Sequence, residues 1–172
     1  MKRTLLGMTG LAVFLALAGT AHAQRNPRGK ASLDLGGKSI SVDFGRPALH
    51  GRKVEEMLSK LPEGEVWRLG ADTSTTFSTS GDLKFGDAKV PKGDYSLWAR
   101  KEAGGKWKLV FNSQHGQWGT DHDPKLDVAE VPLKGSKPAS PPEEVTISLV
   151  KANTGGTIAI EWGDMKLSTE FN

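Results

Sequence analysis

Apolar and polar residues alternate along most of the chain with a period of two. Residues 38–44 alternate strictly, so that Ile40, Val42 and Phe44 share one parity. A strand with one face against a core and the other toward water produces this pattern. The same alternation recurs in residues 107–111, 145–149 and 158–162. We therefore predict half-buried β-strands in these segments.

Glycine pairs separate the alternating segments, at Gly36-Gly37, Gly104-Gly105 and Gly155-Gly156. Glycine is favoured in tight hairpin turns because it adopts positive φ without a steric penalty. Turn signals that recur about every 8–12 residues are typical of sandwiches and barrels rather than of βαβ units. The sequence thus predicts an all-β fold, a single antiparallel β-sandwich of about eight to ten short strands.

One segment changes parity along its length. Leu126 and Val128 keep one parity, whereas Val131 and Leu133 keep the other. A β-bulge inserts one extra residue and would bring both pairs to the same face. We therefore predict a bulge near Ala129.

One short helix is also expected. Val54, Met57, Leu58 and Leu61 are spaced i, i+3, i+4 and i+7, which places them on one helical face, and Pro62 follows.

The N-terminus has the pattern of an export signal. Two basic residues at positions 2–3 precede an uncharged apolar run at residues 5–18, and residues 21–23 read Ala-His-Ala. Small residues in this arrangement form a cleavage site, which predicts removal of residues 1–23 before Gln24. The apolar run is shorter than the ~20 residues of a membrane span. We expect a periplasmic or secreted protein with no membrane span after cleavage.

The remaining segment, residues 24–172, has the length of one domain. Loss of Lys2 and Arg3 changes the balance from 23 basic and 20 acidic residues to 21 and 20, a net charge of +1. Basic residues are scattered among acidic ones, so no nucleic-acid partner is expected. The chain has no cysteine, so disulfides cannot stabilise the fold.

Three arginines, Arg46, Arg52 and Arg68, stand beside Gly, Pro or Trp at predicted loops or strand ends. The planar guanidinium group binds carboxylates and phosphates well. One interpretation is a site for an anionic or carbohydrate-like ligand. The other is internal pairing with carboxylates, for which the candidates are Asp43, Asp72 and Asp94. The candidate ligand-binding residues are Arg46, His50, Arg52, Trp67, Arg68 and Trp118.

Several of these residues belong to short motifs that follow one another along the chain. They are Phe-Gly-Arg-Pro at 44–47, Gly-Arg at 51–52, Gly-Glu-Val-Trp-Arg at 64–68, Gly-Ala at 70–71, Gly-Asp-Tyr-Ser-Leu at 93–97, Asn112, Trp-Gly at 118–119 and Glu-Trp at 161–162. In this order they resemble the family of exported bacterial proteins catalogued as domain of unknown function 2911. The resemblance implies a β-sandwich-like domain and carries no established activity, cofactor or catalytic residue.

Two segments depart from the family pattern. Residues 72–75 read Asp-Thr-Ser-Thr where the family has a run similar to Asn-Glu-Ala-Thr, and Trp-Ala-Arg at 98–100 replaces a continuation that ends in proline. The first departure weakens any role that requires an amide or a glutamate in that loop.

A second group of polar residues contains His115, His122 and Asp123. Imidazoles and carboxylates can bind zinc, but this spacing matches no familiar motif, so we expect neither a metal nor a cofactor. A histidine paired with an aspartate could also act in a hydrolase or lyase. The chain has no Gly-x-Ser-x-Gly elbow and no cysteine to serve as nucleophile, and no catalytic residue is assigned.

The leading interpretation is therefore an exported, non-catalytic binding module whose partner is an unknown small molecule or envelope component. The alternatives are a small secreted hydrolase or lyase that uses a His/Asp site, and a structural interaction protein of the envelope.

Overall fold

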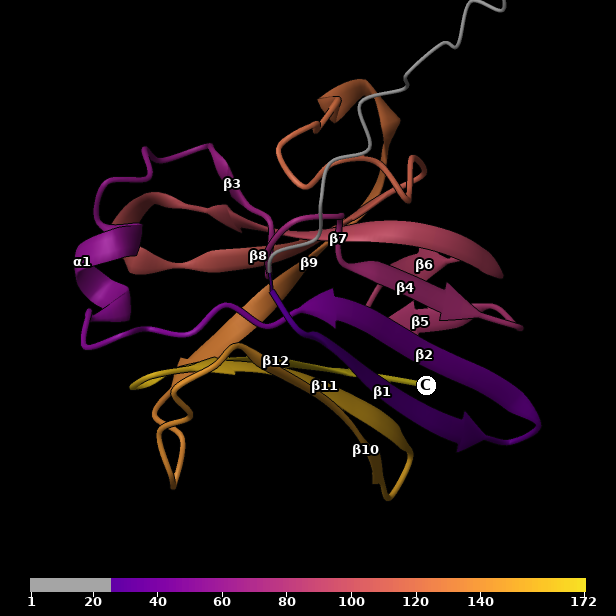
Figure 1. Cartoon of the computed structure of the whole chain (residues 1–172). Coiled ribbons are helices and arrows are strands. Elements are labelled where there is room, and N and C mark those ends of the chain that lie inside the picture. The colour runs from indigo at the N-terminus through magenta and orange to yellow at the C-terminus, as the bar shows by residue number, and fades with distance from the viewer. Residues whose placement is uncertain (1–25) are drawn as a thin grey trace, which may run out of the picture.

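The computed structural model describes residues 26–172, and the predicted signal peptide lies outside them. β-Strands dominate the described residues (Figure 1). The strands are β1 (Arg28–Leu35), β2 (Lys38–Gly45), β3 (Val66–Trp67), β4 (Thr76–Thr79), β5 (Leu83–Phe85), β6 (Ala88–Val90), β7 (Gly93–Lys101), β8 (Trp107–Asn112), β9 (Asp127–Ser136), β10 (Thr146–Ala152), β11 (Gly155–Trp162) and β12 (Met165–Phe171). The described residues also contain one α-helix, α1 (Val54–Leu58), and two short 3-10 helices (Ala103–Gly105 and Pro124–Leu126). Loops connect these elements.

Ten of the strands pair antiparallel in one curled sheet, and β5 and β6 form a separate antiparallel pair. The order of the curled sheet is β1-β2-β4-β7-β8-β9-β12-β11-β10, and β3 pairs with β7 as a side branch. The terminal strands β1 and β10 lie against each other, so the sheet is nearly closed. In Figure 1 β10, β11 and β12 form a lower layer, β7 and β8 an upper one, and β9 crosses between them. The predicted all-β, antiparallel class is confirmed.

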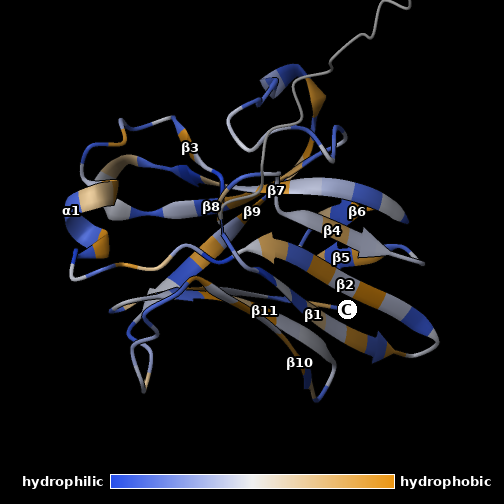
Figure 2. Ribbon diagram, viewed as in Figure 1, coloured by the Kyte–Doolittle hydropathy of each residue, from blue (hydrophilic) through white to orange (hydrophobic). Residues whose placement is uncertain are grey.

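The core fills the space inside the curled sheet. Apolar residues of one parity on each strand point inward, as the alternating bands on β2 show in Figure 2. Val42, Phe77, Leu97, Leu109 and Ile158 are fully buried there. The alternation therefore identified the core-facing parity of β2, β8 and β11.

The first glycine pair forms the predicted hairpin turn. Gly36 and Gly37 have φ values of 57° and 82°, and Leu35 pairs with Lys38 across the turn. The bulge is confirmed as well. Phe111 pairs with Ala129 but Asn112 pairs with Asp127, so that one residue of β9 is skipped.

The turn predicted at Gly155-Gly156 is wrong. The chain turns at residues 153–154, and Gly155 already lies in β11, paired with Ala152. A Cβ atom at Gly155 would lie 1.9 Å from the carbonyl oxygen of Phe171. Glycine is needed at this position because two backbones approach closely, not because the chain reverses direction.

Helix α1 confirms the predicted helix, and it ends before Leu61. Together with β3 it forms the end of the molecule where the candidate site lies, at the left of Figure 1. Within residues 26–172, no helix is long and apolar enough to cross a membrane.

The strand register can be tested by a pair of substitutions in β2. Val42 is fully buried, whereas its neighbour Ser41 is half-buried on the outer face. We expect Val42→Asp to lower the free energy of unfolding by more than about 3 kcal/mol, because it places an unpaired charge in the core. Ser41→Asp should change it by about 1 kcal/mol or less. Urea denaturation measures both; equal losses would refute the register.

Candidate functional site

Arg46 is bound by its own chain. Its guanidinium Nη2 lies 2.9 Å from Oε2 of Glu144, and its Nε donates to the carbonyl oxygen of Val145 at 3.4 Å. The contact joins the segment after β2 to the segment before β10. This is the internal pairing considered from the sequence, although the partner is Glu144 and not one of the three predicted aspartates. Asp43 instead pairs with Arg28.

Arg52 and His50 also make contacts within the chain. Arg52 donates to the carbonyl oxygens of Leu49, at 2.8 Å, and Ala48, at 3.0 Å. The backbone amide of His50 donates to Oε1 of Glu143 at 2.6 Å, and its side chain is exposed. These contacts shape the loop after β2, and no recorded contact joins Arg46, Arg52 and Arg68 to one another.

Trp67 belongs mainly to the core. Its ring stacks on Trp162, with centroids 5.8 Å apart and planes at 10°, and meets Trp107 edge-on at 6.4 Å. Such pairs add stabilisation beyond the buried area itself. Trp67 thus fixes β3 against the end of the sheet and determines where the next residue, Arg68, lies.

The guanidinium group of Arg68 differs from the others. Arg68 is a partly buried residue, yet within residues 26–172 its guanidinium group makes no hydrogen bond or ion pair. The remaining arginines of this range all have partners: Arg28, Arg46, Arg52 and Arg100. The backbone at Arg68 is held, because the hydroxyl of Thr75 donates to its carbonyl oxygen at 3.2 Å. Arg68 therefore combines a held backbone with a guanidinium group that has no partner within residues 26–172.

The residue after Arg68 has a strained backbone. Leu69 is fully buried and has φ 54°, in the left-handed region that bulky residues rarely occupy. This conformation places Leu69 in the core and leaves Arg68 half-exposed. Strain of this kind persists where the surrounding structure enforces it, and it is concentrated at functional sites.

A groove of about 380 Å³ opens beside Arg68, and we call it the Arg68 groove. Its apolar lining comes from Met57, Leu58, Leu61, Val66, Trp67 and Trp98. Two cations, Lys60 and Arg68, also line it, together with Gly119 and Thr120. No acidic residue of the described chain lines this groove, so its charge has one sign.

The loop between β8 and β9 forms one wall of the groove. The amide of Gly119 donates to the carbonyl oxygen of Asp72 at 2.7 Å, and Thr73 pairs with Trp118 in an isolated bridge. A Cβ atom at Gly119 would lie 2.6 Å from that Asp72 oxygen and 3.1 Å from Cδ of Arg68. Glycine therefore allows the loop to approach Arg68. Trp118 is half-buried beside the groove and does not line it.

A polar cluster lies behind the groove. Oδ1 of Asp127 is 2.8 Å from Nε2 of His122 and accepts from Nδ2 of Asn112 at 2.8 Å, and Oδ2 accepts from Arg100 at 2.8 Å. The ring of His122 packs on Trp98, with centroids 4.9 Å apart. Both His122 and Asp127 are about nine-tenths buried. The cluster holds the loop against the outer face of β7 and β8.

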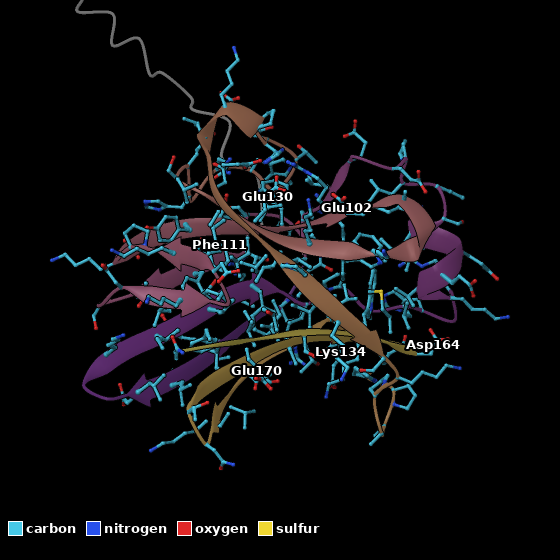
Figure 3. All side chains as sticks on the ribbon, turned by 180° about the vertical axis from the view of Figure 1, so that it is seen from behind. Glu102, Phe111, Glu130, Lys134, Asp164 and Glu170 are labelled. Carbon is cyan, nitrogen blue, oxygen red and sulfur yellow. The ribbon has the colours of Figure 1, made fainter. Side chains whose placement is uncertain are left out.

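The cluster continues along that face as a chain of charges. Arg100 pairs with Glu130, and Nζ of Lys108 lies 3.4 Å from Glu130 and 3.6 Å from Glu102. Figure 3 labels Glu102 and Glu130 in this region, seen from behind. The alternation of opposite charges gives the face little net field.

The weak metal candidates are not brought together. His115 is exposed, and His122 is committed to Asp127 rather than to Asp123. Among the residues that the structure describes, no group of three or more His, Cys, Asp or Glu could hold a metal ion.

A larger hollow of about 690 Å³ lies on the outer face of β1, β2, β4 and β7. Its floor contains Ser32, Ser41, Ser78 and Asp94, which follow one another across the paired strands. Lys30, Lys92 and Asp34 border it. This hollow carries positive and negative side chains together with several hydroxyl groups. It therefore favours no single ligand chemistry.

The pKa values of Tyr95 and Asp82 are clearly shifted, and neither side chain lines the Arg68 groove. Burial raises the pKa of Tyr95, and the charges of Asp82 and Asp94 add to this effect. A hydrogen bond from the backbone amide of Lys92 lowers the pKa of Asp82. Lys92 and Asp94 border the larger hollow, so both shifts belong to that end of the molecule.

The fold and the groove define a class of protein: an all-β domain with a nearly closed antiparallel sheet and a positively charged, otherwise apolar groove between α1 and β3. The chain belongs to the family described as a protein of unknown function, DUF2911, whose model matches residues 26–171. This confirms the resemblance identified from the motifs. No curated protein and no solved structure matches the chain.

The sequence identified part of the groove. Trp67 and Arg68 line it, whereas Lys60 and Trp98 were missed. The one signal for the missed residues was the helical spacing around position 60, which placed Lys60 beside an apolar face. The signal for Gly119 was its place directly after Trp118 in a family motif.

The anchoring role of Asp127 can be tested. We expect Asp127→Ala to lower the free energy of unfolding by about 2–4 kcal/mol, because Asn112, His122 and Arg100 all lose an acceptor. Asp121→Ala is the matched control; Asp121 is exposed in the same loop, and its loss should cost less than about 0.5 kcal/mol. Urea denaturation of both variants measures the difference. A loss for Asp127→Ala no larger than that of the control would show that the cluster does not hold the loop.

Proposed function

We propose that this protein is an exported, non-catalytic binding module for a small organic anion, and that the Arg68 groove is its binding site. The observation that carries the proposal is Arg68, a partly buried residue that lines the groove and whose guanidinium group has no partner within residues 26–172. A guanidinium group without a partner in the chain has its donors available for a carboxylate or phosphate. An anionic ligand in the groove would supply the missing acceptors in the fork geometry that arginine prefers.

The size and charge of the groove fit this function. Its volume of about 380 Å³ lies within the ~300–1,000 Å³ of small-molecule sites. Lys60 provides a second positive charge at the same surface. The segment after the signal peptide is nearly neutral overall, so attraction of an anion would be local rather than a property of the whole surface.

A second candidate function, a hydrolase or lyase, is favoured by one contact, the 2.8 Å distance between His122 and Asp127. A general base needs access to its substrate. Here the imidazole is about nine-tenths buried, with Nε2 bound by Asp127 and the ring against Trp98. Binding without catalysis is therefore the better-supported function.

A purely structural role would require an apolar surface patch for a partner. Within residues 26–172, the large apolar side chains that are exposed are Leu126, Val128 and Val150. Leu126 and Val128 flank the start of β9 and Val150 lies on β10, and none of them borders the Arg68 groove. This arrangement gives the structural role less support than the groove gives to binding.

Arg68→Ala separates a ligand site from a structural arginine. Since its guanidinium has no partner to lose, we expect the free energy of unfolding to change by no more than about 0.5 kcal/mol. Anions that raise the melting temperature of the wild-type protein should no longer do so in the variant; at 100 times the dissociation constant this stabilisation is about 2.7 kcal/mol. Thermal denaturation with and without a panel of carboxylates, phosphate, sulfate and uronates measures both quantities.

Arg52→Ala is the matched control, because Arg52 is exposed, lies outside the groove and binds only local carbonyl groups. It should keep every ligand-dependent shift of the wild type. A destabilisation of about 3 kcal/mol or more by Arg68→Ala, together with no anion-dependent shift in the wild type, would make Arg68 structural and end the proposal.

Export can be tested on the full chain in a host with a secretion pathway. We expect the exported protein to begin at Gln24, because small residues at positions 21 and 23 define the cleavage site. Intact-mass analysis measures the loss of residues 1–23. Ala23→Arg should block cleavage, whereas Gln24→Ala should not. Retention of the wild-type apolar segment in membranes would contradict this prediction.

A further inference from the structure

We infer, resting on the function proposed above, that the ligand class is a monoanion with an unbranched aliphatic body, such as a medium-chain carboxylate. The anionic head pairs with Arg68, and the aliphatic body lies along the groove. The inference follows from how polar and apolar groups are distributed in the lining, and it excludes sugars and inorganic anions as the preferred ligands.

Only a few side chains of the groove lining can form hydrogen bonds or ion pairs with a ligand. Arg68 and Lys60 are the cations, and Thr120 is the one neutral polar side chain among the recorded lining residues. A sugar would bring several hydroxyl groups, and most of them would lose their water without finding a partner. A ligand with one anionic end satisfies Arg68 and leaves no further polar group to satisfy.

The aromatic residues do not form a platform for a ring. Trp98 is only 2% exposed and Trp67 only 9%, so neither presents an open face to a ligand. Trp67 already stacks on Trp162, and Trp98 packs on His122. Sugars and nucleobases commonly bind by stacking on an exposed ring. The tryptophans therefore offer only a small exposed apolar area, and aliphatic side chains supply the rest of the apolar lining.

The helical wall is aliphatic and partly accessible. Met57, Leu58 and Leu61 are half-buried, so each keeps apolar surface that a ligand could cover. Methionine adapts its shape to irregular ligands because its side chain is unbranched and flexible. Exclusion of water by an aliphatic ligand would also strengthen the ion pair with Arg68, because the local dielectric constant falls.

The charged residues near the groove favour a ligand with one negative charge over a ligand with several. Two cations line the groove, but Glu56, Glu63 and Glu65 lie nearby in the sequence and are exposed outside it. A monoanion can pair with Arg68 while these carboxylates stay in water. A multiply charged phosphate would bring more repulsion from them.

The experiment measures affinity by isothermal titration calorimetry for butanoate, hexanoate and octanoate, with octanol, phosphate and glucuronate as comparison ligands. We expect the affinity of the carboxylates to rise about fourfold for each methylene group buried. Octanoate should bind about 10- to 150-fold more tightly than octanol, the range expected for a charge-assisted hydrogen bond. Arg68→Ala should reduce octanoate affinity to that of octanol, and Arg68→Lys should retain part of it.

A second variant tests the aliphatic wall separately. Leu61→Ser should flatten the rise of affinity with chain length and leave butanoate binding nearly unchanged. The melting temperature of each variant without ligand shows that it is folded. Arg52→Ala should behave as the wild type throughout.

The outcomes separate this inference from the proposed function. If phosphate or glucuronate binds more tightly than octanoate and the binding depends on Arg68, the aliphatic class is wrong and the anion site stands. If affinity does not rise with chain length, the class is likewise wrong. If no anion binds the wild type, or binding is unchanged in Arg68→Ala, both the class and the proposed function fall.

Discussion

Burial of both faces of β7 is the constraint on which the rest of the structure depends. Five consecutive residues, Tyr95 to Ala99, are buried, although adjacent residues of a strand point to opposite faces. Leu97 and its neighbours of the same parity pack in the core. The outer face needs a separate cover, because it carries Trp98 and Ser96, whose side chains bond to each other at 2.8 Å. An uncovered Trp98 would expose a large apolar surface at the centre of the sheet.

The loop between β8 and β9 supplies that cover, and the candidate site is a result of it. Asp127 holds the loop at its far end, and Gly119 allows the near end to approach Arg68. The cover stops between Gly119 and α1, where the apolar side chains of α1 remain partly exposed. A groove at the rim of a covered face thus arises from packing. Packing does not explain why the charged residues of the groove are all positive, since packing alone requires neither Lys60 nor Arg68.

The sequence predicted those features that depend on neighbouring residues. Alternation identified the core parity of β2, and a change of parity near Ala129 identified the bulge, because both follow from the two-residue period of a strand.

Long-range contacts could not be predicted in the same way. Nothing next to Arg46 indicates that Glu144, almost one hundred residues away, would neutralise it. The glycine pair at Gly155 was interpreted as a turn. The real reason for glycine there, its close approach to the backbone of Phe171, is a contact between segments that are distant in sequence. For the same reason the three arginines could not be told apart before the fold was known.

Arg68 and Leu69 together present a local conflict. A half-buried cation without a partner and a buried leucine with positive φ are each unfavourable, and here they are adjacent. Stability alone does not require a cation at 68, since no hydrogen bond or ion pair of its guanidinium group within residues 26–172 would be lost. An anion in the groove, as proposed, would give the charge of Arg68 its partner, and the apolar lining would strengthen that ion pair. The same surroundings that disfavour the empty site therefore favour the occupied one, which is the property expected of a binding site and not of a structural loop.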